Sequence, residues 1–243
     1  MAVPAPDLAA LRQLGERVRP LSAASERLLP VPPAFVDLVP LGGLVRGSTV
    51  ATTGGAATSL ALALAGPTTT SGAWCAVVGL AHLGLLAAAE LGVSLERTLL
   101  VADPGPQEWA ATVAALLDAV EVVLVQPSHT LTPTTQRRLV ARARDRGSVL
   151  VQAGGHVRVW ATQPDLIVAS GASQWEGLGA GHGRLRARRV EVSVAGRRAA
   201  TRTRHGVLWL PGSDGHITRA EPLAAAPRAA DVAPALAPLR DAG

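Results

Sequence analysis

The chain has 243 residues, of which 48% are hydrophobic, and its formal net charge is +5. The apolar content excludes a disordered chain, and the single cysteine excludes an intramolecular disulfide framework or a cysteine-rich metal site. The positive charge permits contact with nucleic acid or an acidic partner but does not require it.

The amino-terminal segment, residues 1–34, is expected to be semi-detached from the rest. Leu8, Leu11 and Leu14 fall on one face of a short helix predicted at 6–19, and three prolines between positions 30 and 33 then indicate an extended connector. The apolar face of this helix either packs on its own domain or contacts a partner or a second copy.

From residue 48 onward, short apolar runs alternate with helical segments. This alternation is typical of a mostly parallel sheet covered by helices on both faces. We expect strands at 49–52, 73–78, 98–102, 122–125 and 148–152, helices at 58–65, 82–91, 107–119 and 134–145, and a threonine-rich loop at 67–72. Trp74 and Trp160 fall in expected strands and are therefore expected in the core.

After residue 153 the pattern changes to short strands, expected at 157–160, 165–169, 188–194 and 205–210. They predict a small antiparallel extension of the sheet, with a core domain at 35–220. From residue 221 the chain is rich in alanine and proline, which predicts a disordered tail at 221–243.

The longest apolar stretch, residues 73–93, has the length of a membrane span. His82, Glu90 and three glycines interrupt it, so a buried strand followed by a buried helix is the better interpretation. Because the amino-terminus also lacks the pattern of a secretion signal, we expect a cytoplasmic protein.

Residues 51–58 lie where a phosphate-binding loop is expected, between a strand and a helix. A working loop of this kind reads G-x-x-x-x-G-K-[ST]. Here Ala51, Ala56 and Ala57 stand at the positions of the two glycines and the lysine, and only Thr58 keeps the required hydroxyl. The segment thus has the strand and the helix that flank a nucleotide site, but it lacks the glycines and the lysine that bind phosphate.

Gly54 and Gly55 leave a flexible loop that could bind some anion, but Ala57 removes the cation that contacts the β- and γ-phosphates. Neighbouring Ser128 and His129 do not form a catalytic triad by themselves. We therefore expect no catalytic residue, no cofactor and no metal.

The carboxyl-terminal half is rich in arginine. Strand alternation would place Arg184, Arg186 and Arg188 on one face, and Arg202 and Arg204 on one face of the next strand. Such a face suits weak DNA contact, docking of an acidic partner or plain solvation. The complete set is Arg184, Arg186, Arg188, Arg189, Arg197, Arg198, Arg202 and Arg204.

Trp175 stands in a glycine-rich segment, residues 170–183, which we expect to be a loop. A tryptophan there is either an exposed anchor for a partner or a side chain that pins the loop to the domain. Leu8, Leu11 and Leu14 are the other candidates for partner contact.

The order of these elements resembles the RecA family of recombinase ATPases over roughly residues 35–218. Residues 41–50 resemble the family's glycine-rich approach to its phosphate loop, and residues 189–192 and 206–210 resemble its late hairpin. The family's Walker B strand ends in aspartate, whereas the strand at 122–125 is followed by Gln126. Ala81 lies nearest the position of the family's catalytic glutamate.

The phosphate loop is degenerate, and the connections after the strands at 122–125 and 148–152 are short. These features resemble one subgroup best, the ImuA-type accessory proteins of bacterial mutagenic translesion synthesis. The resemblance implies an ImuB-type, polymerase-like adaptor as partner and, through it, a sliding clamp and an error-prone replicative-type polymerase. It also implies association with the nucleoid after DNA damage and leaves a homo-oligomer open.

The function expected from the sequence is therefore that of a catalytically inactive RecA-like scaffold that binds the adaptor. Two alternatives stay open: a divergent ATP-binding NTPase whose phosphate site is rebuilt from other residues, and a stand-alone DNA-binding modulator of recombination. Nucleotide-dependent stabilisation would favour the first alternative, and DNA affinity with a steep salt dependence would favour the second.

Overall fold

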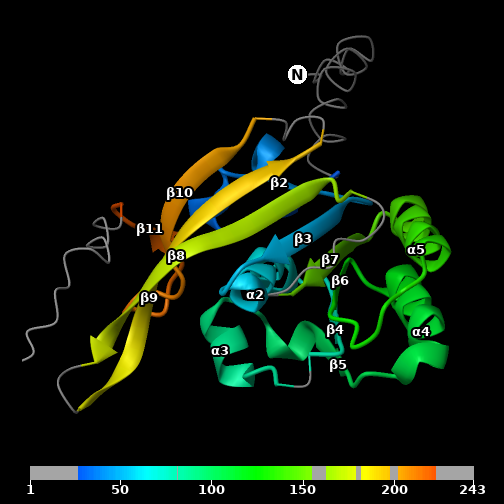
Figure 1. Cartoon of the computed structure of the whole chain (residues 1–243), viewed down its shortest axis with the longest axis horizontal. Helices are drawn as coiled ribbons and strands as arrows, with labels where there is room; N and C mark the ends of the chain where they lie inside the picture. The colour runs from blue at the N-terminus through cyan, green and yellow to red at the C-terminus, as the bar shows by residue number, and fades with distance from the viewer. Residues whose placement is uncertain (1–26, 81, 155–162, 179–181, 198–201, 223–243) are drawn as a thin grey trace, which may run out of the picture.

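The structure is a computed structural model that describes residues 27–80, 82–154, 163–178, 182–197 and 202–222. Within these residues, nine strands form one sheet in the order β11-β10-β9-β8-β3-β7-β6-β4-β5 (Figure 1). The expected amino-terminal helix, Trp160, Arg198 and the tail lie outside the described residues. The proposed domain boundaries stay predictions.

The parallel half of the sheet matches the alternation of the sequence. Neighbouring strands from β5 through to the start of β8 all run parallel. The strands are β3 (Thr49–Thr53), β4 (Cys75–Val78), β5 (Thr98–Val101), β6 (Val122–Val125), β7 (Val149–Ala153) and β8 (Leu166–Leu178).

Helices cover both faces of this half (Figure 1). On one face lie α2 (Ala57–Thr70) and α3 (Leu85–Glu90), and on the other lie α4 (Gly105–Ala119) and α5 (Pro133–Arg146). Short 3-10 turns occur at η1 (Pro33–Phe35), η2 (Pro40–Gly42) and η3 (Leu95–Arg97), and a separate small sheet pairs β1 (Leu28–Pro30) with β2 (Gly43–Val45).

The two faces of strand β6 pack in two different hydrophobic cores. Val122 and Leu124 pack in the core beneath α2, whereas Val123 and Val125 pack in the core that contains Trp109 of α4. All four strand residues are fully buried. A strand buried on both faces is a continuous apolar run, which is why the sequence pattern identified it correctly.

Helix α2 is longer than expected. It continues through Pro67 to Thr70, where the sequence predicted a threonine-rich loop. Proline removes one backbone donor, but threonine side chains satisfy nearby carbonyl groups: the Thr69 hydroxyl donates to the Gly66 carbonyl at 2.7 Å, and the Thr70 hydroxyl donates to the Pro67 carbonyl at 3.1 Å. The prediction of a loop at 67–72 was therefore wrong.

The second strand and second helix are shorter than expected. Strand β4 begins at Cys75, so Trp74 lies just before it and is 37% exposed, not buried in the core as predicted. Helix α3 begins at Leu85. Among the described residues, no helix is long and apolar enough to cross a membrane.

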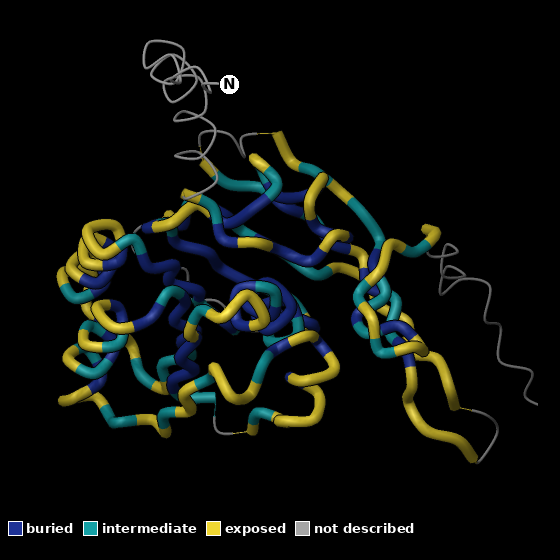
Figure 2. The backbone as a smooth tube through the Cα atoms, turned by 180° about the vertical axis from the view of Figure 1, so that it is seen from behind, coloured by how far each residue is buried: buried dark blue, intermediate teal, exposed yellow. Residues whose placement is uncertain are grey.

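The antiparallel half confirms the small antiparallel extension that the sequence predicted. It consists of β8, β9 (Gly183–Gly196), β10 (Arg204–Trp209) and β11 (Thr218–Arg219). The segment 170–183, predicted as a loop, is mostly strand. Its far part, residues 171–178 with 183–188, is here called the ribbon; it extends beyond the helices, and most of its residues are exposed (Figure 2).

Candidate functional site

The turn between β3 and α2 is where a RecA-like protein would hold phosphate. Strand β3 runs through Thr53 and α2 begins at Ala57, so only Gly54, Gly55 and Ala56 join them. Ala51, aligned with the first glycine of the motif, lies inside β3 and pairs with strands on both sides. Three residues form a tight turn, closed by the Ala57 N–H donating to the Gly54 carbonyl at 3.1 Å.

Ser170 of β8 fills the side of this turn. The Ser170 hydroxyl accepts a hydrogen bond from the Ala56 N–H at 2.9 Å and donates to the Thr53 carbonyl at 3.0 Å. Gly54 has a φ of +85°, and a Cβ there would lie 2.2 Å from the Ser170 carbonyl oxygen. In a phosphate loop the backbone amides face the ligand, whereas here a strand occupies that side and uses one amide.

The first turn of α2 brings no cation to replace the missing lysine. Ala57 is buried, and Thr58 is half-buried beside it. Gln126 follows β6, where its backbone N–H donates to the Val78 carbonyl at 3.0 Å. Strand β7 separates β6 from β3, and the Gln126 side chain is a neutral amide where the family has a carboxylate.

A positive charge reaches the turn from the ribbon. Nη2 of Arg188 lies 3.7 Å from the position that a Cβ on Gly55 would take. The same nitrogen donates to the Ser173 hydroxyl at 3.1 Å, and the guanidinium carbon lies 5.1 Å from the centre of the Trp175 ring. Burial lowers the pKa of Arg188 below its ordinary value. Arg188 thus places a positive charge beside the turn.

A second arginine–tryptophan pair follows the first in the sequence of β9. Arg189 stacks over Trp209 of β10 at 5.4 Å, donates to the Gln174 amide oxygen at 3.1 Å and lies 3.8 Å from the Glu176 carboxylate. Because Arg188 and Arg189 follow one another in β9, their side chains leave opposite faces of the strand. These two arginines hold the strands together.

The arginines predicted as one surface, of which the structure describes all except Arg198, have different roles. Arg204 donates to the Asp37 and Val39 carbonyls at 3.1 and 3.2 Å and so ties β10 to the segment around η1. A register shift between the Glu176–Ala187 and Leu178–Gly183 pairs interrupts the alternation expected for Arg184, Arg186 and Arg188. The exposed members are Arg184, Arg186, Arg197 and Arg202.

Trp175 lies on β8 directly opposite Arg188, and it remains 45% exposed. It is therefore a strand residue and not a loop residue as expected. Leu178 and Leu185, at the far end of the ribbon, are 65% and 48% exposed. The ribbon combines exposed apolar side chains with arginines, the composition of a surface that contacts a partner.

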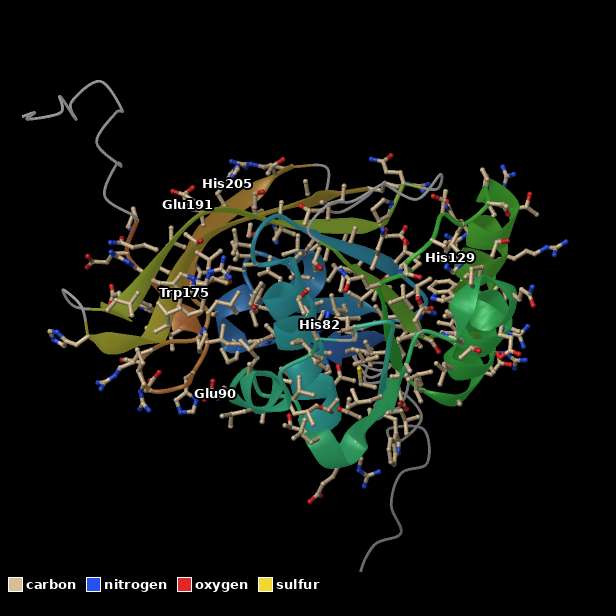
Figure 3. All side chains as sticks on the ribbon, turned by 60° about the horizontal axis from the view of Figure 1, so that its bottom comes forward. His82, Glu90, His129, Trp175, Glu191 and His205 are labelled. Atoms are coloured by element: carbon tan, nitrogen blue, oxygen red, sulfur yellow. The ribbon has the colours of Figure 1, made fainter. Side chains whose placement is uncertain are left out.

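Sequence reasoning missed a polar cluster beyond the carboxyl ends of β5 and β6. A hydrogen bond with Ser128 lowers the pKa of Asp103, and the nearby His129 contributes in the same direction. The His129 ring packs edge-on against Trp109 with centroids 5.8 Å apart. His129 and Trp175 lie at opposite ends of the molecule (Figure 3). The carboxylate contacts serine directly and not through histidine, so this is not the arrangement of a catalytic triad.

No group of three or more histidine, cysteine, aspartate or glutamate side chains within the described residues is arranged to hold a metal ion. Cys75 is buried in β4, and burial raises the pKa of its thiol to about 12. A thiol with such a pKa stays protonated near neutral pH and is a poor nucleophile.

Comparisons with known proteins agree with the fold. The crystal structure of the RadB recombinase superposes with a TM-score of 0.55 and 16% identity, covering 78% of this chain and 98% of that chain. At this identity the likeness establishes the fold alone, and it confirms the RecA-like architecture expected from the sequence.

Two sequence comparisons establish the family. The uncharacterised protein Rv3395c of Mycobacterium tuberculosis (strain ATCC 25618 / H37Rv) is 37% identical over 147 residues, which cover 59% of this chain and 70% of that protein. The family described as the MT3502 N-terminal domain matches residues 37–161, which include the closed turn, β6 and α5. The chain therefore belongs to the MT3502 N-terminal domain family.

Proposed function

We propose that this protein is a catalytically inactive, RecA-like accessory protein of bacterial mutagenic translesion synthesis, of the ImuA type. It acts by binding a polymerase-like adaptor of the ImuB type, and through this adaptor it joins a sliding clamp and an error-prone polymerase. Nucleotide binding has no part in this action.

The observation that carries the proposal is the closed turn between β3 and α2. Phosphoryl transfer needs backbone amides around the phosphates, a cation at the γ-phosphate and a carboxylate near the metal. The turn has three residues, Ser170 uses the Ala56 amide, and alanine and glutamine stand at the positions of the lysine and aspartate. A RecA-like fold without these parts is suited to holding partners.

The ribbon is the surface that we assign to the adaptor. Trp175 is an exposed aromatic side chain stacked with Arg188, and tryptophan and arginine are the residues that most often dominate binding energy at protein interfaces. Arg184 and Arg186, further along the ribbon, keep the assembly near DNA through weak phosphate contacts.

The direct test is affinity capture of the tagged full chain from its own cells after DNA damage, followed by mass spectrometry. We expect a polymerase-like adaptor to be enriched, and Trp175→Ala to reduce its recovery about tenfold, since one anchor residue contributes about 1–2 kcal/mol. Arg137→Ala is the control, because Arg137 is also exposed but lies on α5, away from the ribbon. Absence of any polymerase-like protein would contradict the proposal.

A second candidate function is that of a stand-alone DNA-binding protein. The observation in its favour is the exposure of Arg184, Arg186 and Arg202. Affinity of the purified chain for duplex DNA without a partner, falling steeply between low and physiological salt, would support it. Weak affinity that becomes tight only with the adaptor present would favour the accessory role.

A further inference from the structure

The outer edge of β5 has features of an interface that the proposed function does not use. Among the described strands, β5 pairs only with β4 and ends the sheet (Figure 1). Leu99 and Leu100 are 39% and 53% exposed, although they leave opposite faces of the strand. An open apolar edge strand is a template for pairing with another chain.

The surroundings of this edge are also apolar. Leu95 of η3, which runs directly into β5, is exposed, and so are Leu85 and Leu86 of α3, which packs on η3. Trp74 precedes β4 and is exposed beside them, with the Arg97 guanidinium 5.3 Å from its ring centre. Monomeric proteins rarely expose apolar side chains gathered in this way.

The backbone of β5 is ready to pair. The Val101 carbonyl accepts a hydrogen bond from the Gly79 N–H at 3.1 Å, on the side of β4. Backbone groups of successive strand residues point to opposite sides, so the N–H and C=O of Leu100 point to the open edge. Leu100 is thus the natural centre of a hydrogen-bonded pair with another strand.

The sequence around Leu100 is complementary to itself when read in antiparallel order. If Leu100 pairs with Leu100 of a second copy, then Leu99 pairs with Val101, Thr98 with Ala102, and Arg97 with Asp103. The residues of the Leu99–Val101 pair lie on one face of the strand, as antiparallel pairing requires, and Arg97, the last residue of η3, and Asp103 flank β5 on its two sides. Apolar residues meet at the centre, and opposite charges meet at both ends.

The two charged residues are placed for this pairing. Arg97 and Asp103 are both exposed at the two ends of β5. The Asp103 carboxylate accepts the Gly105 N–H at 3.1 Å, and its hydrogen bond with Ser128 lowers its pKa, so it is ionised at neutral pH. Directly opposite unlike charges stabilise a strand pair, and like charges destabilise it.

From this self-complementarity we propose that the protein forms a symmetric dimer in which the β5 strands of two copies pair antiparallel about a two-fold axis at Leu100. The interface is isologous, because the same strand contributes both sides and each Arg97–Asp103 pair occurs twice. The proposal is independent of the accessory role and concerns a different edge of the sheet from the ribbon.

The first test places a cysteine on the proposed axis. Cα atoms of a hydrogen-bonded antiparallel pair lie about 5.5 Å apart, a separation that a disulfide spans. We expect Leu100→Cys to form a disulfide-linked dimer rapidly under mild oxidation. The native Cys75 is buried and does not compete. Ala111→Cys, an exposed position on α4, is the matched control and should stay monomeric on a non-reducing gel.

The second test reverses the charges, with sedimentation velocity as the measurement. Arg97→Asp and Asp103→Arg should each weaken the dimer about tenfold or more, because each places like charges opposite one another twice. An equal mixture of the two variants should form heterodimers, since every pair then joins an arginine to an aspartate. Heterodimer formation also shows that both variants are folded.

The proposal is overturned if the full chain sediments as a monomer at every concentration tested. It is equally overturned if Leu100→Cys cross-links no faster than Ala111→Cys, or if the charge variants dimerise as well alone as when mixed. Circular dichroism of each variant before sedimentation separates loss of pairing from loss of fold, since Asp103 also bonds the first turn of α4.

Discussion

The parallel and antiparallel halves of the sheet use strands in opposite ways. Strands β3, β4, β6 and β7 of the parallel half have four or five residues and are largely buried between two helical layers, whereas β8 and β9 run for 13 and 14 residues and leave the ribbon exposed. The first half is here called the frame, and the second carries the surface that we propose for the adaptor. Ser170 lies where the two halves meet. There its hydroxyl, on β8, bonds the turn between β3 and α2 and closes it.

The largest expected difference between the halves concerns their tryptophans. Trp109→Ala removes a fully buried side chain from the core under α4 and should lower the free energy of unfolding by about 4 kcal/mol. Trp175→Ala, in the exposed ribbon, should cost about 1 kcal/mol or less, mainly because the Arg188 guanidinium no longer has a ring to stack on. Urea unfolding of both variants measures the two losses of stability. Equal losses would contradict the distinction between a buried frame and an exposed ribbon.

The next effect concerns the turn where the halves meet. Gly54→Ala should lower stability by about 2–3 kcal/mol, because the new Cβ meets the Ser170 carbonyl and the backbone has positive φ. Gly72→Ala is the matched control: its φ is +95° but the space around it is open, so it should cost about 1 kcal/mol. Similar losses for both would mean that Ser170 does not fill the turn.

Ser170→Ala tests directly whether the Ser170 hydroxyl closes the turn. It leaves the Ala56 N–H and the Thr53 carbonyl without the hydroxyl that joins them, so we expect a loss of about 1–2 kcal/mol by thermal or urea unfolding. Nucleotide affinity should not appear in this variant, because the turn remains short and has no lysine. A gain of ATP binding would show that the hydroxyl alone blocks the site.

The arginines of the ribbon should have a smaller effect, on DNA affinity. Replacing Arg184 and Arg186 together by alanine should lower the slope of log affinity against log salt by about 1 for each DNA phosphate that the protein no longer neutralises. Arg137→Ala, an exposed change on α5, should leave the slope unchanged. If both variants behave alike, the DNA affinity is a property of net charge and not of the ribbon.

The smallest effect is expected at an exposed ion pair in the frame. The Arg142 and Arg146 side chains beside Asp118 lower the pKa of its carboxyl group. A lowered folded-state pKa stabilises the protein above the unfolded pKa, and this contribution is lost as pH falls through the folded value. The stability difference from Asp118→Asn should therefore shrink below a pH of about 4. A difference independent of pH would contradict this.

The frame could be predicted from the sequence because its inner strands β3, β4, β6 and β7 are largely buried on both faces. The run Val122–Val125 and the helical segments around it have one structural interpretation, and the structure confirms it. Helix α2 was cut short in the prediction because proline usually ends a helix, and no periodic signal shows that the helix continues past Pro67 to Thr70.

The site was harder to predict because it depends on contacts between distant segments. The missing lysine and glycines in 51–58 could be read directly, but the Ser170 bond to Ala56 joins residues 114 positions apart. Glycines at 171 and 177 made the ribbon resemble a loop, although they lie at or beside shifts in strand register. The complementarity of residues 97–103 can also be read in the sequence. It suggests pairing between two copies only because the structure shows that β5 is an open edge strand.

The central claim is that the closed turn between β3 and α2 binds no nucleotide, and the most direct measurement is calorimetric titration of Mg-ATP into the purified full chain. We expect no binding heat beyond dilution and no change in melting temperature at saturating nucleotide. Saturable binding that is lost when Thr58 is replaced by alanine would contradict it, because the phosphates would then sit at the turn that Ser170 closes.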